Sequence, residues 1–213
     1  MKKLSLLALT LSACVQATDY TYVNDPLTEY DALGMPLVSV NVNDNLPPDI
    51  LNNIYSMLPE STQVNPAFVA PDTLSNVSIG TDVTTYAEAF VTFLNEGAGY
   101  RNSLGYFIYD TNNPPATRAD INEHVIIFPN ASNPDAGNMS QGDTVDLKVQ
   151  ILGGQTLGFF VVPNGWGYNG HDSKIKNDGP WGQPFYSLAH LNPESVNEQR
   201  HNVVFIDPVS ELV

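Results

Sequence analysis

The chain is nearly free of cysteine. Among its 213 residues only Cys14 is a cysteine, and it lies within residues 1–17, which have the layout of an export signal. Two lysines there precede an apolar run from Leu4 to Leu11, which is too short to span a bilayer. Once this segment is removed, no disulfide can form, so core packing or bound ions must stabilise the exported chain.

Two cleavage patterns compete in the signal. Val15-Gln16-Ala17 fits the small-x-Ala pattern and would release a mature chain that begins at Thr18. Leu11-Ser12-Ala13-Cys14 resembles a lipobox, which would leave Cys14 lipidated as an outer-membrane anchor. Because the apolar run is short for a lipoprotein signal, we favour the soluble product. Either pattern predicts an exported protein that is periplasmic, on the outer-membrane surface or extracellular.

Basic residues are scarce as well. The chain has 8 Lys and Arg against 23 Asp and Glu, a formal charge of −15, and removal of residues 1–17 makes it −17 because two lysines are lost. Such a surface repels the phosphates of nucleic acids and anionic lipids. We therefore expect no nucleic-acid partner, and membrane attachment only through a lipidated Cys14. Ca²⁺ is a natural counter-ion where carboxylates converge.

Common catalytic and metal-site motifs are missing. The sequence has no G-x-S-x-G elbow, no phosphate-binding Gly-x-x-x-x-Gly-Lys loop and no H-E-x-x-H pattern, and its four histidines are scattered. The full EF-hand spacing is absent too. These absences argue against a zinc site, a serine-nucleophile elbow and a phosphate-binding loop of the usual patterns.

Residues 18–76 predict an irregular N-terminal arm with one helix. Asn, Asp and Pro recur along the arm, and a short strand is predicted near Leu37–Val42. Over residues 48–58, apolar side chains recur at positions 50, 51, 54, 57 and 58, the spacing of one helical face. Proline precedes this segment, and Pro59 follows it as a stop signal. Such a short helix needs a partner for its apolar face, so we expect it to pack against the rest of the chain.

Residues 77–213 predict an all-β domain. Runs rich in β-branched and aromatic residues alternate with turn signals such as Asn-Pro-Pro and Gln-Gly-Asp. Since no helix intervenes, the pattern indicates an antiparallel β-sandwich or jelly roll. The chain stops within a strand-like pattern, so we expect the domain to be truncated at its C-terminus. The predicted strands are Val77–Ile79, Ala87–Leu94, Ser103–Tyr109, His124–Phe128, Thr144–Val149, Thr156–Val162, Trp181–Tyr186 and Asn202–Ile206.

Glu96 stands among glycines between two predicted strands, and three interpretations are open. It is a solvated turn residue, a metal ligand or hydrogen-bonding structural group, or a catalytic acid. Hydrolysis of a glycosidic bond would require a second carboxylate at a fixed separation. Asp110, Asp143 and Asp146 are candidates, but sequence spacing across strands gives no distance.

The stretch from residue 164 to 172, N-G-W-G-Y-N-G-H-D, offers a candidate ligand site. A tryptophan face packs on a pyranose ring while amides and carboxylates bind its hydroxyls. Trp166, Tyr168 and Asp172 therefore predict a sugar-binding platform. The alternative is that Trp166 caps the end of the β core while the glycines turn the chain.

Five sequence blocks together resemble one family. Residues 93–107, F-L-N-E-G-A-G-Y-R-N-S-L-G-Y-F, are similar to the signature strand pair of the bacterial domain-of-unknown-function family 4114, which includes exported LruC-type proteins. I-F-P-N-A-S (127–132), Q-G-D-T-V (141–145), L-G-F-F-V-V-P-N-G-W (157–166) and R-H-N-V-V (200–204) match its later blocks in order. The resemblance is strong over residues 85–213 and loose over residues 18–84.

The resemblance implies a function in adhesion. Family members are exported or cell-surface proteins, often parts of calcium-dependent adhesins, with no established enzymatic activity. The family's acidic position falls on Glu96 and its asparagine on Asn102, while its downstream acidic loop is absent here. We expect a calcium-binding, non-enzymatic protein of the cell surface, extracellular matrix or biofilm, whose partner is a surface or matrix component, glycans included. The predicted metal ligands are Glu96, Asn102, Asp110 and Asp143.

Overall fold

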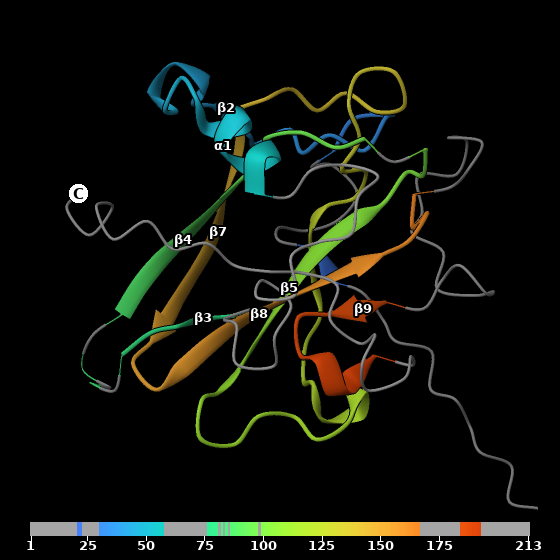
Figure 1. Cartoon of the computed structure of the whole chain (residues 1–213). Coiled ribbons are helices and arrows are strands. Elements are labelled where there is room, and N and C mark those ends of the chain that lie inside the picture. The colour runs from blue at the N-terminus through green and yellow to red at the C-terminus, as the bar shows by residue number, and fades with distance from the viewer. Residues whose placement is uncertain are drawn as a thin grey trace, which may run out of the picture.

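Two β-sheets form the protein in its computed structural model (Figure 1), which describes residues 21–22, 30–57, 76–80, 82, 84, 86–97, 99–166 and 184–192. In this part of the chain, the larger sheet has six strands and the smaller sheet has three. All strand pairs are antiparallel except the short parallel pair of β1 with β6. The prediction of an antiparallel β-sandwich with one short helix is confirmed.

The larger sheet has the order β1-β6-β5-β8-β3, and β9 also pairs with β8. The smaller sheet has the order β2-β7-β4. The larger sheet contains β1 (Thr21–Tyr22), β6 (Val125–Phe128), β5 (Ser103–Asp110), β8 (Gln155–Val162), β3 (Val77–Ser78) and β9 (Phe185–Tyr186). The smaller sheet contains β2 (Val40–Asn41), β7 (Asp143–Leu152) and β4 (Tyr86–Thr92). The helix α1 spans Ile50–Met57, and short 3₁₀ turns span Asn43–Asn45, Arg118–Asp120 and Ala189–Leu191.

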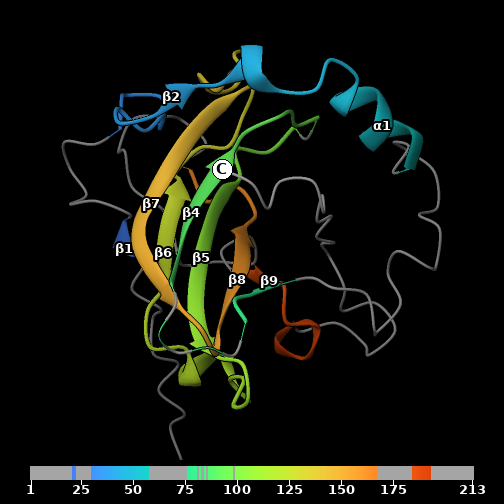
Figure 2. The same cartoon turned by 90° about the vertical axis from the view of Figure 1, so that its left-hand side faces the viewer.

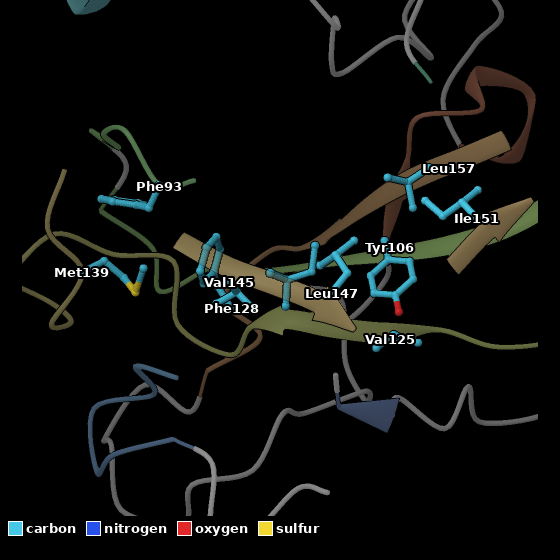
Figure 3. Close-up of a cluster of buried hydrophobic side chains, with 10 residues drawn as sticks. Phe93, Tyr106, Val125, Phe128, Met139, Val145, Leu147, Ile151 and Leu157 are labelled. Carbon is cyan, nitrogen blue, oxygen red and sulfur yellow. The ribbon is translucent and has the colours of Figure 1, made fainter. Parts of the chain in front are cut away.

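The main core lies between the two sheets (Figure 3). Val145, Leu147 and Ile151 project from β7, and Tyr106, Val125 and Leu157 project from the larger sheet toward them. Alternate residues of β7 are buried, as expected for a strand with one face on a core. This burial of apolar area is the main stabilising contribution in a fold that has no disulfide among its described residues.

The larger sheet is buried on both of its faces. Its second face carries another apolar cluster, which includes Phe107, Ile126, Phe160 and Tyr186. Ile121, directly after the 3₁₀ turn at residues 118–120, and Leu191, in the turn at residues 189–191, belong to this cluster. Double burial explains why β6, V-I-I-F, is continuously apolar and has no buried–exposed alternation.

Glycine and phenylalanine alternate across the central pair of strands. In the register of β5 and β8, Gly105 lies opposite Phe160, and Phe107 lies opposite Gly158. Each ring covers the glycine across from it: a Cβ atom added at Gly105 would lie 2.3 Å from Cζ of Phe160, and one at Gly158 would lie 2.4 Å from Cζ of Phe107. The two glycines are therefore required for close aromatic packing within the sheet.

A buried histidine lies in the second cluster. His124 is 5 % exposed, its Nε2 lies 2.9 Å from the hydroxyl of Tyr186, and its ring packs edge-on against Phe160. Burial lowers the pKa of His124 to about 4. Burial also raises the pKa of Tyr186 to about 12, so both groups are neutral at pH 7.

The predicted elements match the observed ones to within a few residues. The helix predicted over 48–58 is α1, and seven predicted strands correspond to β2, β3, β4, β5, β6, β7 and β8. The strand predicted over Trp181–Tyr186 corresponds to β9, but residues 181–183 lie outside the described residues. The strand predicted over Asn202–Ile206 and the predicted export signal lie outside them too. No helix in the described ranges is long and apolar enough to cross a membrane.

Replacement of Gly158 by alanine should destabilise the fold. The new methyl group would overlap the ring of Phe107, and overpacking of this kind costs about 1–3 kcal/mol. Urea denaturation of Gly158→Ala would measure the loss. Gly80→Ala is the matched control, because nothing lies within 4 Å of an added Cβ there. Equal stabilities for the two variants would contradict the packing described for β5 and β8.

Acidification should weaken the fold through His124. Its pKa in the folded chain, about 4, lies below the ordinary value of 6.5, so the stabilising contribution is complete above pH 6.5 and is lost as the pH falls toward 4. The free energy of unfolding should fall by up to about 1.4 kcal/mol per pH unit in this window relative to His124→Gln. Chemical denaturation at several pH values measures the difference, with the exposed His190→Gln as control. Parallel profiles for the wild-type chain and His124→Gln would contradict the buried neutral histidine.

Candidate functional site

A hollow of about 490 Å³ opens between α1 and one end of the sandwich. Figure 2 shows α1 beside the end of the sheets at which β4 ends and β5 begins. The walls are mainly apolar, and their polar groups come from a few side chains in the two chain crossings. The lining residues are Leu51, Ile54, Tyr55, Thr92–Gly97, Asn102–Leu104, Phe128, Ala131 and Val161.

A chain of amide contacts ties three segments together around the hollow. Asn95 Nδ2 donates to the hydroxyl of Tyr55 on α1, and Asn95 Oδ1 accepts a hydrogen bond from Asn133 Nδ2 at 2.9 Å. Asn133 Nδ2 also donates to the backbone oxygen of Glu96. Because these bonds join α1, the exit from β4 and the loop after β6, they fix the shape of the hollow.

Glu96 and Asn102, two of the predicted metal ligands, both line this hollow. Glu96 is half-buried, and its Oε1 accepts a hydrogen bond of 3.1 Å from the backbone N–H of Asn133. Asn102 Oδ1 accepts the backbone N–H of Asn164 at 3.0 Å. Glu96 is therefore more than a solvated turn residue: it is held in place, next to an apolar space, by the backbone of the neighbouring loop.

The other two predicted metal ligands lie elsewhere. Asp143 is 5 % exposed, with Oδ2 accepting the N–H of Ser140 at 2.6 Å and Oδ1 accepting Asn41 Nδ2 at 2.9 Å. Its carboxylate fixes the turn into β7. Asp110 stands at the far end of β5, about 23 Å along the strand from its start, where it accepts the N–H of Asn112 in a turn. Asp110 and Asp143 therefore do not line the hollow that Glu96 and Asn102 line.

The described residues do not by themselves complete a calcium site. No group of three His, Cys, Asp or Glu side chains in the described ranges is placed to hold a metal ion. Ca²⁺ takes about six to eight oxygen ligands, and Glu96 and Asn102 supply only part of such a set. Glu96 Oε1 and Asn102 Oδ1 also each accept a backbone N–H.

Trp166 is not a sugar-binding platform in this structure. Its side chain is 0 % exposed, and its ring packs edge-on against Tyr30 with 5.4 Å between ring centroids. Gly34, at a φ of 87°, lies so close that an added Cβ would be 3.1 Å from the Trp166 ring. Trp166 caps the end of the core, the alternative noted from the sequence, because a large aromatic side chain gains most when it is buried. Tyr168 and Asp172 lie outside the described residues.

Buried polar atoms gather at the same end of the sandwich. Four side-chain atoms lack a hydrogen-bond partner within the described part of the chain: Asn130 Oδ1, Ser132 Oγ, Asn164 Oδ1 and Trp166 Nε1. Both hydrogens of Asn130 Nδ2 are used, at 2.7 Å to the backbone oxygen of Leu33 and 3.2 Å to that of Ala136. Ordered water is the usual partner of such groups.

Sequence reasoning missed Tyr55 and Asn133 as members of the site. The helical spacing over 48–58 indicated that α1 needed a partner but did not show where that partner lies. Asn133-Pro134-Asp135 indicated only a turn between two predicted strands. Comparisons with models of known families, with curated proteins and with solved structures find no match to this chain. The resemblance to family 4114 stays a prediction.

Removal of the Asn133 side chain should loosen the hollow. Asn133→Ala loses the bonds to Asn95 and to the Glu96 carbonyl, which should reduce stability by about 1 kcal/mol and speed amide hydrogen exchange over residues 93–97. Asn138→Ala is the matched control, because Asn138 Nδ2 bonds to Asp31 at 2.9 Å. Unchanged exchange over residues 93–97 in Asn133→Ala would show that the amide contacts do not hold this segment.

Proposed function

We propose that this chain is an exported, non-enzymatic binding module that takes up part of a cell-surface or matrix component in the hollow beside α1, in support of adhesion or matrix assembly. The hollow carries the proposal. A space of about 490 Å³ with mainly apolar walls and a few fixed polar groups has the usual size and character of a ligand site. The export signal and the block resemblance support a location outside the cytoplasm.

The charge of the site favours a cationic ligand. Glu96 is the only carboxylate among the described residues that line the hollow, and no lysine, arginine or histidine is among them. The whole chain carries a formal charge of −15, which attracts cations toward any exposed face. The preferred occupant is therefore an apolar group next to one positive charge, such as an apolar peptide segment with a lysine or arginine.

Hydrolysis of a glycan is the weaker candidate. Two-carboxylate hydrolysis needs a second acid about 5–10 Å from the first. The candidate acids other than Glu96 have different tasks: Asp110 and Asp143 fix turns, and Asp146 pairs with Lys148 at 2.6 Å. These contacts favour a binding role for Glu96.

Calcium is the ion that we propose for a site at Glu96 and Asn102, with water or oxygens of a partner as the remaining ligands. Carboxylate and amide oxygens are ligands that Ca²⁺ prefers, and extracellular modules bind it weakly. Binding of an organic cation needs no metal in this proposal, so the two ligands would compete for Glu96.

Hexylammonium should bind in the hollow more tightly than hexanoate. The apolar chains are alike, but only the ammonium group is attracted to Glu96, which should give about threefold to tenfold tighter binding in EDTA-containing buffer. Titration followed by ¹H–¹⁵N NMR should shift the amides of residues 93–97 and Asn102. Glu96→Gln should remove the preference, and Ala131→Phe should fill the hollow and abolish both interactions.

Either of two results would overturn the proposal that the hollow binds a ligand. If neither probe shifts amides near the hollow, or if Ala131→Phe binds as the wild-type chain does, the hollow is not a ligand site. Ala116→Phe is the control, because residue 116 is exposed and lies outside the hollow.

Calcium should raise the melting temperature of the EDTA-treated chain in a concentration-dependent way, since a ligand that binds only the folded state stabilises it by mass action. Glu96→Gln should abolish the rise. Asp110→Asn should keep it, because Asp110 lies at the far end of β5. If calcium does not change the melting temperature of the wild-type chain, the calcium proposal is overturned. The proposal that the hollow binds organic cations would not be affected by that result.

A further inference from the structure

Two aromatic rings are exposed on the outer face of the smaller sheet. In Figure 2, β4 and β7 lie in front of the larger sheet, so this outer face is turned toward the viewer. Tyr86 and Phe90 on β4 are 56 % and 59 % exposed. The intervening alternate residue, Glu88, is exposed on the same face, whereas Ala89 packs toward the main core. The sequence Y-A-E-A-F thus places small residues inward and large rings outward.

The neighbouring strand completes the face with polar side chains. In the register of β4 and β7, Glu88 lies opposite Gln150, and Phe90 lies opposite Asp146. Asp146 forms an ion pair of 2.6 Å with Lys148, so charges of both signs lie beside Phe90. At the other end of the face, Tyr86 lies opposite Leu152, which is also exposed. Hydrogen-bonding groups therefore lie between two apolar ends.

We propose that this face binds a neutral oligosaccharide. The rings of Tyr86 and Phe90 would pack on the apolar faces of two sugar rings, while Glu88 and Gln150 would bind hydroxyl groups between them. The two aromatic residues are four positions apart on one strand, about 13 Å. A single sugar does not reach both rings, so the ligand is an oligosaccharide.

Charge and composition argue against other occupants. A second copy of the chain would bring together two chains that each carry a formal net charge of −15. The centre of a protein–protein interface is depleted in charged residues, whereas Glu88 and Asp146 lie among the rings here. Nucleic acid and anionic lipid are repelled by the same net charge. A neutral sugar needs no opposite charge, and it offers both the apolar faces and the hydroxyls that this surface can contact.

The site is separate from the hollow. Tyr86, Glu88, Phe90 and Gln150 do not line the hollow, and the aromatic pair stands on the outer side of β4. Glycan binding on this face therefore does not depend on the proposed function of the hollow, and the two can be tested apart.

The test is isothermal titration of the full chain with neutral hexasaccharides, namely cellohexaose, chitohexaose, xylohexaose and mannohexaose. At least one should bind, and Tyr86→Ala and Phe90→Ala should each weaken that interaction at least tenfold. Tyr100→Ala is the matched control: Tyr100 is also exposed, but it lies outside β4, so this variant should bind as the wild-type chain does. Ala131→Phe, which fills the hollow, should also keep full glycan binding.

Thermal melting verifies that each variant is folded, which is expected because the replaced side chains are exposed. Absence of binding to all four hexasaccharides would overturn the proposal. So would equal binding by the wild-type chain, Tyr86→Ala and Phe90→Ala. A concentration-dependent dimer that is lost in Tyr86→Ala and Phe90→Ala, without glycan binding, would assign the face to a second copy of the chain.

Discussion

The pairing of β5 with β8 is the interaction on which the other parts of the structure depend. Eight consecutive residues of β5 pair with β8, from Ser103 opposite Val162 to Asp110 opposite Gln155. Glycine and phenylalanine alternate across this pair, so that the rings fill the space that each glycine leaves. The start of β5 and the end of β8 bring Asn102 and Val161 to the hollow. The site is therefore built on the most extensively paired part of the larger sheet, and it inherits that rigidity.

Much of the fold could be predicted from the sequence because its patterns have simple physical causes. Runs of β-branched and aromatic residues between turn signals marked the strands, and helical spacing marked α1. The burial on both faces of β6, V-I-I-F, became known only from the structure. Strand order and register depend on contacts between segments far apart in the chain. The spacing of residues along the chain therefore does not predict which strands pair or in which register.

The candidate site could be predicted only in part, for the same reason. Glu96 and Asn102 are six positions apart across one chain crossing, so their proximity was accessible to sequence reasoning. Asp110 is separated from them by the length of β5. The carboxylate of Asp143 accepts the N–H of Ser140 and so stabilises the turn before β7. Trp166 lies in a stretch whose residue types are typical of sugar-binding sites, but its side chain is buried in the core. Tyr86 and Phe90 were not predicted as site residues, and their exposure on β4 became known only from the structure.

Two separate surfaces suit the proposed role of the chain as an exported binding module. The hollow presents apolar walls and a carboxylate, and the outer face of the smaller sheet presents aromatic rings and neutral hydrogen-bonding groups. In our proposal the hollow receives an apolar cation. Intermolecular nuclear Overhauser effects between hexylammonium and the ¹³C-labelled chain would locate the bound cation. We expect contacts from the hexyl chain to the methyl groups of Leu51, Ile54 and Leu104. Contacts confined to other parts of the surface, or none at saturating hexylammonium, would contradict it.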